Sequence, residues 1–277
     1  MKTRFSFGRS LLYATLVLVT VFMLFPIVWM VLTAIKPTAE IYSFTPSWLP
    51  TRIEWEHLHA AWVERDFKLY FWNSLIVSVV TSFFSTVVAV FGAYALSRFE
   101  FYGKRFLSMF VLLIYLVPVI LLAVPFYLIL SELGLSDTRV GLILAVSTYA
   151  VPFSVWVLRG FFTQIPPEIE EAAVVDGTSR IGALYWVVLP IAIPGILATA
   201  LFSFILAWDD YLFSLIVINS DKLRTLPLAI GLLANDLEIT DGVMMAMGTI
   251  TTLPIVFLYL AFQRYFIGGL SSGAVKG

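Results

Sequence analysis

Six long stretches of this sequence contain no charged residue, and no other feature restricts the possible fold so strongly. Crossing a bilayer core of about 30 Å takes roughly 20 apolar residues in a helix, and each stretch is long enough, the fourth only just. Because backbone groups in lipid must be hydrogen-bonded within their own segment, each stretch is expected to form a helix. The sequence therefore predicts an all-α polytopic membrane protein with six transmembrane helices. They cover residues 10–35, 69–97, 106–131, 140–158, 181–208 and 242–263.

Prolines lie inside most of these stretches. Proline removes a backbone donor and disfavours a straight helix, but neighbouring helices can cover the freed carbonyl groups in a membrane protein. The prolines are therefore expected to kink the helices rather than to break them. They are Pro26, Pro118, Pro125, Pro152, Pro190, Pro194 and Pro254.

The composition also favours a lipid environment. Hydrophobic residues make up 60% of the chain and charged residues 13%, against about 45–50% and about 25% in soluble domains. The lack of cysteine excludes disulfides and thiolate metal sites, and a net charge of −1 gives no indication of a nucleic-acid partner. The basic N-terminus could begin a secretory signal. However, the first apolar stretch exceeds a signal core of about 7–15 residues and no small-residue cleavage site closes it, so we expect a retained helix.

The charged residues between the helices are unevenly divided between the two sides of the membrane. One side carries ten basic and five acidic residues, and the other carries seven basic and eleven acidic residues. Short cytoplasmic loops are enriched in Lys and Arg, so both termini are expected in the cytoplasm. The outer loops would then be 36–68, 132–139 and 219–241. In the first of them, His57 and His59 are expected on solvated surface rather than at a metal site.

The segment between the fourth and fifth helices contains most of the candidate functional residues. Pro166 and Pro167 are placed to open a short helix, glutamates fall in its first turn, and Gly177 is placed to end it. Thr178 or Ser179 can cap the helix that follows. The short helix would present a stripe of small residues suited to the groove of another protein. Periodicity alone favours an ordinary amphipathic connector.

The spacing within this segment resembles a known signature. Residues 171–190 begin with E-A-A, have a glycine after three more residues, and end in V-x-L-P nine residues later. This is similar to the E-A-A-x3-G-x9-I-x-L-P pattern of the EAA loop of ABC importer permeases, and the only departure is valine in place of isoleucine. Residues 93–104, 208–213 and 263–277 look like the MalG branch of carbohydrate permeases. The resemblance therefore covers nearly the whole chain.

This resemblance implies the type I ABC importer transmembrane fold and a division of the chain into three parts. Residues 1–68 would hold the N-terminal cytoplasmic tail, the first helix and an outer loop. Residues 69–264 would form the transmembrane domain, with a cytoplasmic coupling loop at 164–182, and 265–277 would be a cytoplasmic tail. In such permeases the EAA helix docks in a cleft of the ATPase and transmits its closure to the transmembrane helices. The residues that the resemblance implies in coupling are Glu170, Glu171, Ala172, Ala173, Asp176, Gly177, Leu189 and Pro190, with Gly269, Ser272 and Gly273 of the tail also contacting the ATPase.

The resemblance also implies the function and the partners. The chain contains no G-x-x-x-x-G-K-[ST] phosphate loop, so we expect no enzyme activity and no cofactor in this chain, with ATP and Mg²⁺ bound by a partner subunit. The chain would form half of the channel for a sugar or sugar-like solute, in the cytoplasmic (inner) membrane of a prokaryote. Its partners would be a second permease subunit in a heterodimer, two ATP-binding cassette subunits and an extracytoplasmic solute-binding protein.

The main alternative is an ion-coupled secondary transporter of a small polar solute. Such proteins usually contain functional ionisable groups near the bilayer midplane and often show inverted repeats. Neither feature is clear in this sequence, and the E-A-A pattern would then be a coincidence.

Asp209 and Asp210 are the only acids expected at the depth of the bilayer, where ionisable groups usually face a cavity or a partner. With Trp208 and Tyr211 they form the candidate substrate path, since sugars need hydrogen-bond acceptors. The other interpretation, which we favour, is that the two aromatic residues mark the outer interface and the acids lie near water or support packing. MalG-like permeases more often have Trp-Asn-Glu at this position.

Overall fold

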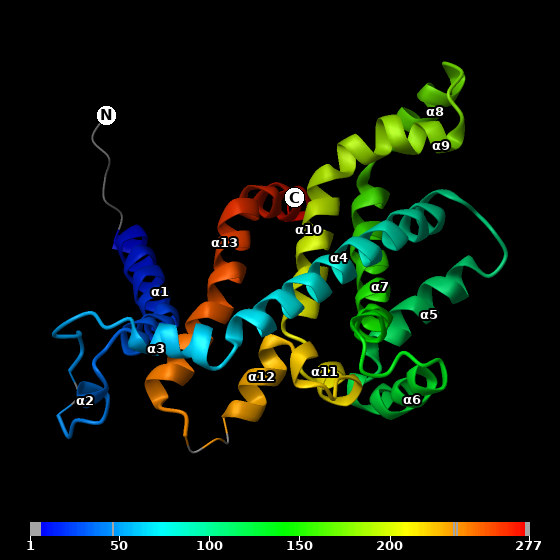
Figure 1. The fold of residues 1–277 in the computed structure, drawn as a ribbon. Helices are drawn as coiled ribbons and strands as arrows, with labels where there is room; N and C mark the ends of the chain where they lie inside the picture. The colour runs from blue at the N-terminus through cyan, green and yellow to red at the C-terminus, as the bar shows by residue number, and fades with distance from the viewer. Residues whose placement is uncertain (1–6, 46, 235, 237, 275–277) are drawn as a thin grey trace. The chain divides into compact units, whose positions relative to one another are not determined.

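The computed structural model describes residues 7–45, 47–234, 236 and 238–274. The described part of the chain is built from helices and contains no β-strand (Figure 1). The α-helices are α1 (Phe7–Ala34), α2 (Thr38–Ile41), α3 (Glu56–His59), α4 (Phe67–Arg98), α5 (Lys104–Leu116), α6 (Val119–Glu132), α7 (Arg139–Gln164), α8 (Pro167–Val175), α9 (Arg180–Ala183), α10 (Leu189–Trp208), α11 (Leu212–Val217), α12 (Leu226–Leu233) and α13 (Asp241–Ala274). π-Helical turns at Ala60–Glu64 and Leu184–Val188 continue α3 and join α9 to α10, and a 3-10 turn covers Asp221–Leu223.

Among the described residues, five helical segments are long and apolar enough to cross a membrane, and one bent pair of helices brings the number to six. The bent pair consists of α5 and α6, whose axes differ by 96°. Six spans are therefore reached when this pair counts as one, as the sequence predicts. The five single segments are Leu11–Ala34, Phe67–Arg98, Arg139–Gln164, Arg180–Trp208 and Asp241–Gln263.

The bend between α5 and α6 shows that the expectation of a simple kink at Pro118 was wrong. Val117 is extended, with φ −68° and ψ 127°, and Pro118 stands at the start of α6. A residue before proline avoids the helical region because the proline ring collides with its backbone. The third predicted span is thus two shorter helices. The other prolines remain within helices, as expected: Pro26, Pro125, Pro152, Pro190, Pro194 and Pro254.

The contacts divide the chain into two units, of which the first contains Met1–Lys68 and Leu232–Leu253. A buried lysine organises the loop after α1 in this unit. Lys36 is 3% exposed, its ammonium lies 4.4 Å from the centre of the Trp29 ring, and it donates a hydrogen bond to the Ser47 carbonyl oxygen. The cation–π contact and the hydrogen bond offset the free-energy cost of removing the Lys36 ammonium group from water.

The prediction that both histidines lie on solvated surface was wrong for His57. Its ring nitrogen Nε2 donates to the carbonyl oxygen of Lys36 at 3.1 Å, and its ring lies against Gly242, where a Cβ atom would have no room. His57 is therefore buried, while His59 is exposed. The loop supplies a carbonyl partner that a sequence pattern does not reveal.

The second unit contains Leu69–Gly231 and Pro254–Gly277 and is built around α4, α7 and α10. A first apolar cluster joins the cytoplasmic halves expected for these three helices, and a second cluster joins α4 and α7 to α6, α11 and α12. Hydroxyl groups add contacts between helices: Ser154 and Ser203 are 2.7 Å apart, and Ser82 donates to the Ala200 carbonyl oxygen at 2.6 Å. The first cluster contains Ala89, Ala93, Tyr94, Leu96, Val155, Leu158, Phe162, Ile165, Leu184, Val188 and Ala192.

Small residues allow α7 and α10 to approach closely, as is common between helices in lipid. A Cβ atom added at Gly195 of α10 would lie 2.4 Å from the Phe161 ring of α7. A Cβ atom added at Gly160, one residue before Phe161, would meet nothing within 4 Å. The two glycines belong to the same pair of packed helices but differ in the space around them.

We predict that Gly195→Ala destabilises the protein and that Gly160→Ala does not. Overpacking of this kind costs about 1–3 kcal/mol, whereas alanine in an open helical position gains roughly 0.5–1 kcal/mol over glycine. Thermal unfolding of the purified variants in the same lipid nanodiscs measures the difference. Equal unfolding temperatures for the two variants would contradict the close packing of α7 against α10.

Candidate functional site

The helix α8 is opened by two prolines and closed by a glycine. Ile165 is extended because Pro166 follows it, and Pro167 occupies the first turn, where its missing N–H group is not needed. At the other end Gly177 has φ +93°, in the left-handed region. The Gly177 N–H donates to the Val174 carbonyl at 3.1 Å, and the N–H of the next residue donates to the Ala173 carbonyl at 3.0 Å. These two bonds are the Schellman pattern of helix termination.

A new helix starts directly after this turn. The Ser179 hydroxyl accepts a hydrogen bond from the Gly182 N–H at 3.0 Å and caps α9. Of the two cap residues expected from the sequence, Ser179 is the one used. The chain then passes without interruption through the π-helical turn into α10. Within the segment 165–183, α8 therefore ends in a defined turn, and a membrane-spanning segment begins directly after it.

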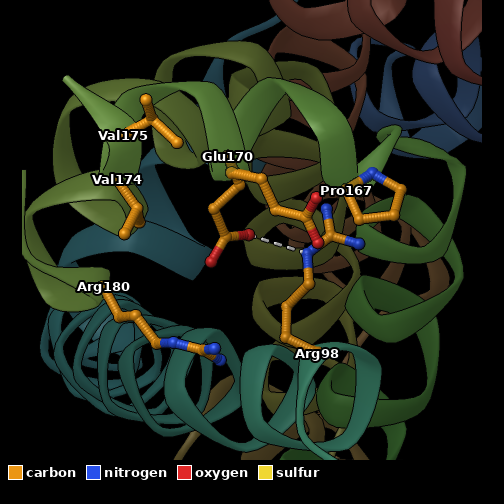
Figure 2. A pocket seen from close by; sticks show the side chains of 7 residues that line it. Arg98, Pro167, Glu170, Val174, Val175 and Arg180 are labelled. Carbon is orange, nitrogen blue, oxygen red and sulfur yellow. Dashed lines mark hydrogen bonds and ion pairs between the residues drawn. The ribbon is translucent and has the colours of Figure 1, made fainter.

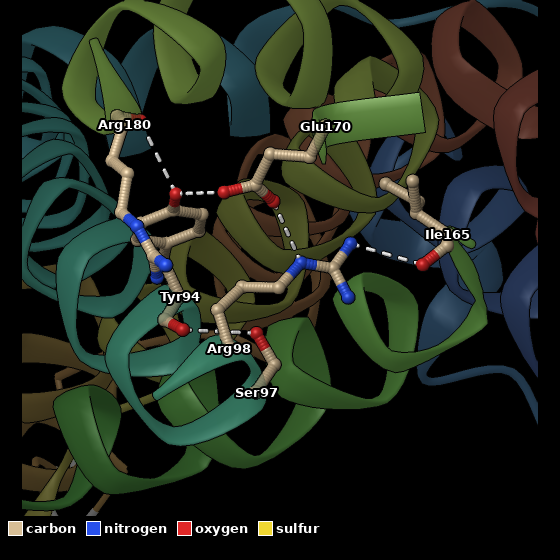
Figure 3. A network of polar contacts seen from close by, with 6 residues as sticks. All are labelled: Tyr94, Ser97, Arg98, Ile165, Glu170 and Arg180. Atoms are coloured by element: carbon tan, nitrogen blue, oxygen red, sulfur yellow. Dashed lines mark hydrogen bonds and ion pairs between the residues drawn. The ribbon is translucent and has the colours of Figure 1, made fainter. Parts of the chain in front are cut away.

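A polar network fastens α8 to the end of α4 (Figure 3). Arg98, the last residue of α4, donates from Nε to the Glu170 carboxylate at 2.9 Å and from its terminal nitrogen to the Ile165 carbonyl oxygen at 2.9 Å. The Tyr94 hydroxyl, one turn earlier on α4, lies within hydrogen-bonding distance of the Glu170 carboxylate and of the Arg180 carbonyl oxygen. The Arg98 and Glu170 side chains are each 9% exposed, so the ion pair is largely screened from water.

A pocket of about 350 Å³ opens beside this network (Figure 2). Arg98 and Glu170 line it together with Arg180, whose guanidinium group lies 5.7 Å from the Phe99 ring centre. Arg180 is exposed and has no ion-pair partner among the described residues. The complete lining is Arg98, Pro167, Glu170, Glu171, Val174, Val175 and Arg180.

The two neighbouring glutamates of α8 both line this pocket but differ in exposure. Glu170 faces inward and is 7% exposed, whereas Glu171, the next residue, is exposed. Ala172 is also exposed and Ala173 is partly buried. The outer surface of α8 is therefore formed by a free carboxylate and small side chains, with Val175 beside them at 86% exposed.

The remaining candidate residues lie on other parts of the chain. Asp176 is exposed and immediately precedes the Gly177 turn. Leu189 and Pro190 begin α10, where Leu189 packs against the apolar cluster that also contains Val188. Gly269, Ser272 and Gly273 lie in the last turns of α13.

Of the four candidates for the substrate path, two are buried and two are exposed. Trp208 is fully buried, stacked on Phe204 with ring centres 5.4 Å apart. Asp210 is 8% exposed and accepts hydrogen bonds from the Ser214 N–H at 2.9 Å and the Ser214 hydroxyl at 3.1 Å, so its carboxylate is bonded to the first turn of α11. Asp209 and Tyr211 are exposed.

Sequence analysis missed the contribution of Arg98 and Tyr94. Both residues lie in the 93–104 stretch that resembles the MalG branch, and Arg98 counts among the basic residues that indicate the membrane orientation, but neither was assigned a contact. Its spacing of four residues from Tyr94 places both side chains on one face of α4. That signal indicates a shared face but does not identify the carboxylate that the two residues bind.

A family model described as "Binding-protein-dependent transport system inner membrane component" matches residues 85–271. The chain belongs to this family. The match contains the whole of the α8 segment and the end of α4. The expected resemblance to ABC importer permeases is thereby confirmed.

Similar proteins span nearly the whole chain. The inner membrane ABC transporter permease protein YcjP of Escherichia coli K12 is 36% identical over 96% of this chain and 95% of its own. The diacetylchitobiose uptake system permease protein DasC of Streptomyces coelicolor is 36% identical over 98% of each chain. The trehalose/maltose transport system permease protein MalG of Thermococcus litoralis is 33% identical over 97% of each.

Solved structures confirm the fold. A chain of a bacterial ABC transporter involved in the import of the acidic polysaccharide alginate aligns over 96% of this chain and 100% of its own, with a TM-score of 0.78 and 22% identity. A chain of the MetNI methionine ABC transporter aligns over 70% of this chain and 91% of its own, with a TM-score of 0.59 and 21% identity. The fold is therefore the ABC importer transmembrane fold that was expected.

We predict that Gly177→Ala loosens α8 and the turn after it, because a residue with a Cβ atom pays about 1–2 kcal/mol in the left-handed region. Hydrogen exchange of the amides at 173–183 should accelerate about tenfold, and Gly177→Asn should have a smaller effect since asparagine tolerates this region better. Gly103→Ala is the matched control, because Gly103 also has a positive φ, +86°, and an open surrounding. It should leave exchange at 173–183 unchanged; equal acceleration by both alanine variants would contradict a local role for Gly177.

Proposed function

We propose that this chain is one of two permease subunits that together form the translocation pathway of an ATP-driven importer for a sugar or sugar-like solute. Family membership supports a transport role, and the relatives named for diacetylchitobiose and for trehalose and maltose support a carbohydrate cargo. Alternating access would carry the solute between the two permeases. The second permease would be a different chain, so that the channel is a heterodimer.

The energy for transport would enter through α8. The observation that carries this proposal is the orientation of two neighbouring residues: Glu171 is exposed while Glu170 is fixed inward. A short helix with a free carboxylate, small side chains and two exposed valines can lie in the groove of another protein. Glu171 would pair with a basic group of the ATPase, Ala172 and Ala173 would allow close approach, and Gly177 would set the turn.

The other contacts of the assembly follow from this arrangement. Two ATP-binding cassette subunits would bind ATP and Mg²⁺, because this chain contains no phosphate-binding loop. The tail residues Gly269, Ser272 and Gly273 would give a second contact to the ATPase. An extracytoplasmic solute-binding protein would deliver the solute, and both termini would be cytoplasmic, as the distribution of Lys and Arg indicates.

Only the exposed residues of the candidate substrate path remain available to contact a solute. Trp208 and Asp210 are committed to contacts within the chain. Asp209 and Tyr211 are exposed and would offer the acceptor and the aromatic surface that a sugar requires. We therefore propose these two residues, rather than all four, as the contacts of the translocation pathway.

We predict that Glu171→Lys in the assembled transporter abolishes uptake driven by ATP and lowers the amount of ATPase subunit that co-purifies. The variant places a positive charge where the partner is expected to be basic, and like charges at an interface are strongly unfavourable. The matched control is Glu168→Lys, which makes the same change at another exposed glutamate of the same helix. Uptake into proteoliposomes with internal ATP, and separately with an ion gradient alone, provides the measurement.

Two results would overturn the proposal. One is normal uptake and normal stimulation of ATPase activity by loaded binding protein in Glu171→Lys. The other is uptake that depends on an ion gradient and not on ATP, which would favour a secondary transporter.

A further inference from the structure

The connection between α8 and α4 is more specific than a single ion pair. Two residues on one face of α4 hold the α8 segment at three separate places. Arg98 binds the Ile165 carbonyl before α8 and the Glu170 side chain within it, and Tyr94 reaches Glu170 and the Arg180 carbonyl after the turn (Figure 3). Contacts before, within and after α8 restrict its rotation as well as its translation relative to α4.

Apolar packing does little to fix α8 by itself. Ile169 is 42% exposed, Val174 is 39% exposed and Val175 is 86% exposed. Glu170 is the only fully buried side chain of this helix. The position of α8 relative to α4 therefore depends mainly on the polar contacts of Glu170 and of the backbone on either side of it.

On the α4 side of this network, Tyr94 is held by aromatic packing. The Tyr94 ring lies edge-on to Phe99 and Phe162, with ring centres 5.7 Å and 6.4 Å apart. Tyr94 and Phe162 belong to the apolar cluster shared by α4, α7 and the start of α10. A force applied to Glu170 is therefore delivered to a packed group of membrane-spanning helices, and packed elements move as discrete bodies rather than deforming continuously.

We infer that Arg98 and Tyr94 are positioning residues which, through Glu170, make α8 and the cytoplasmic end of α4 move as one body during the transport cycle. Adjacent residues of α8 would then have separate roles: Glu171 binds the ATPase, and Glu170 passes the displacement inward. This inference rests on the proposed coupling function of α8 and adds the route by which that coupling reaches the membrane-spanning helices.

Reversing the charge of one partner places two like charges together in a largely buried site, which is strongly unfavourable. Arg98→Glu and Glu170→Arg, each alone, should therefore reduce the solute transported per ATP hydrolysed by about tenfold or more, within the usual range of coupling between sites. The exchanged pair, Arg98→Glu with Glu170→Arg, should restore most of that ratio. Glu168→Arg is the control, because this exposed residue of the same helix has no ion-pair partner among the described residues.

Tyr94→Phe keeps the ring and its packing but removes the hydroxyl, so it tests the network in a variant that should assemble normally. We expect a loss of roughly fivefold in solute transported per ATP, at the lower end of coupling effects. Tyr185→Phe is the matched control, because Tyr185 is an exposed tyrosine of the same region. Stimulation of the ATPase by loaded binding protein is measured in parallel.

The motion itself can be followed with spin labels. The chain contains no cysteine, so labels can be placed at Val175→Cys on α8 and Phe91→Cys on α4, both exposed positions, in an assembly whose partner subunits are free of cysteine. With the native network the label-to-label distance should be the same in the nucleotide-free and ATP-bound transporter. In Tyr94→Phe the distribution should broaden and differ between the two states.

The inference is overturned if Tyr94→Phe matches Tyr185→Phe in both coupling and label distance, or if the exchanged pair assembles and remains uncoupled. These outcomes are distinguishable from failure of the proposed function. If Glu171→Lys uncouples transport while the Arg98, Glu170 and Tyr94 variants behave as wild type, α8 still couples to the ATPase by another internal route. If Glu171→Lys has no effect, the proposed function itself fails.

Discussion

A bilayer offers no hydrogen-bond partner to a polypeptide backbone, and this constraint accounts for most of the structure. It requires long apolar helices, and it leaves little attraction between them except close packing and a few polar contacts. Gly195 and the Ser154–Ser203 contact meet that need between α7 and α10. Within α10, the Thr199 hydroxyl donates to the Gly195 carbonyl oxygen one turn earlier at 2.8 Å, so its donor is satisfied inside its own helix.

Outside the apolar spans, burial within the protein gives special weight to the polar network between α4 and α8. An ion pair at a water-exposed surface contributes little, whereas the Arg98–Glu170 pair is largely buried and needs every one of its hydrogen bonds. The backbone carbonyl groups of Ile165 and Arg180 complete it. The network therefore specifies one position for α8, and a helix in a defined position can transmit a displacement where a loosely attached one would absorb it.

Much of this architecture could be predicted because it depends on local rules. The Pro166–Pro167 start, the Gly177 turn and the Ser179 cap each follow from the backbone preferences of one or two residues. The break at Pro118 and the burial of His57 could not be predicted in this way. The first depends on whether neighbouring helices support a continuous span, and the second depends on the Lys36 carbonyl, which is far from His57 in sequence.

The sequence by itself determined the membrane-spanning segments and the helix between the fourth and fifth of them. Charge-free length and terminal residues are local quantities, and lipid leaves few alternatives to a helix. Only the tertiary structure decided that Glu170 is buried against Arg98 while Glu171 stays exposed. Neighbours on a helix differ by about 100° in direction. Which direction is covered depends on α4, because Arg98 and Glu170, which are joined by a hydrogen bond, are 72 residues apart in the chain.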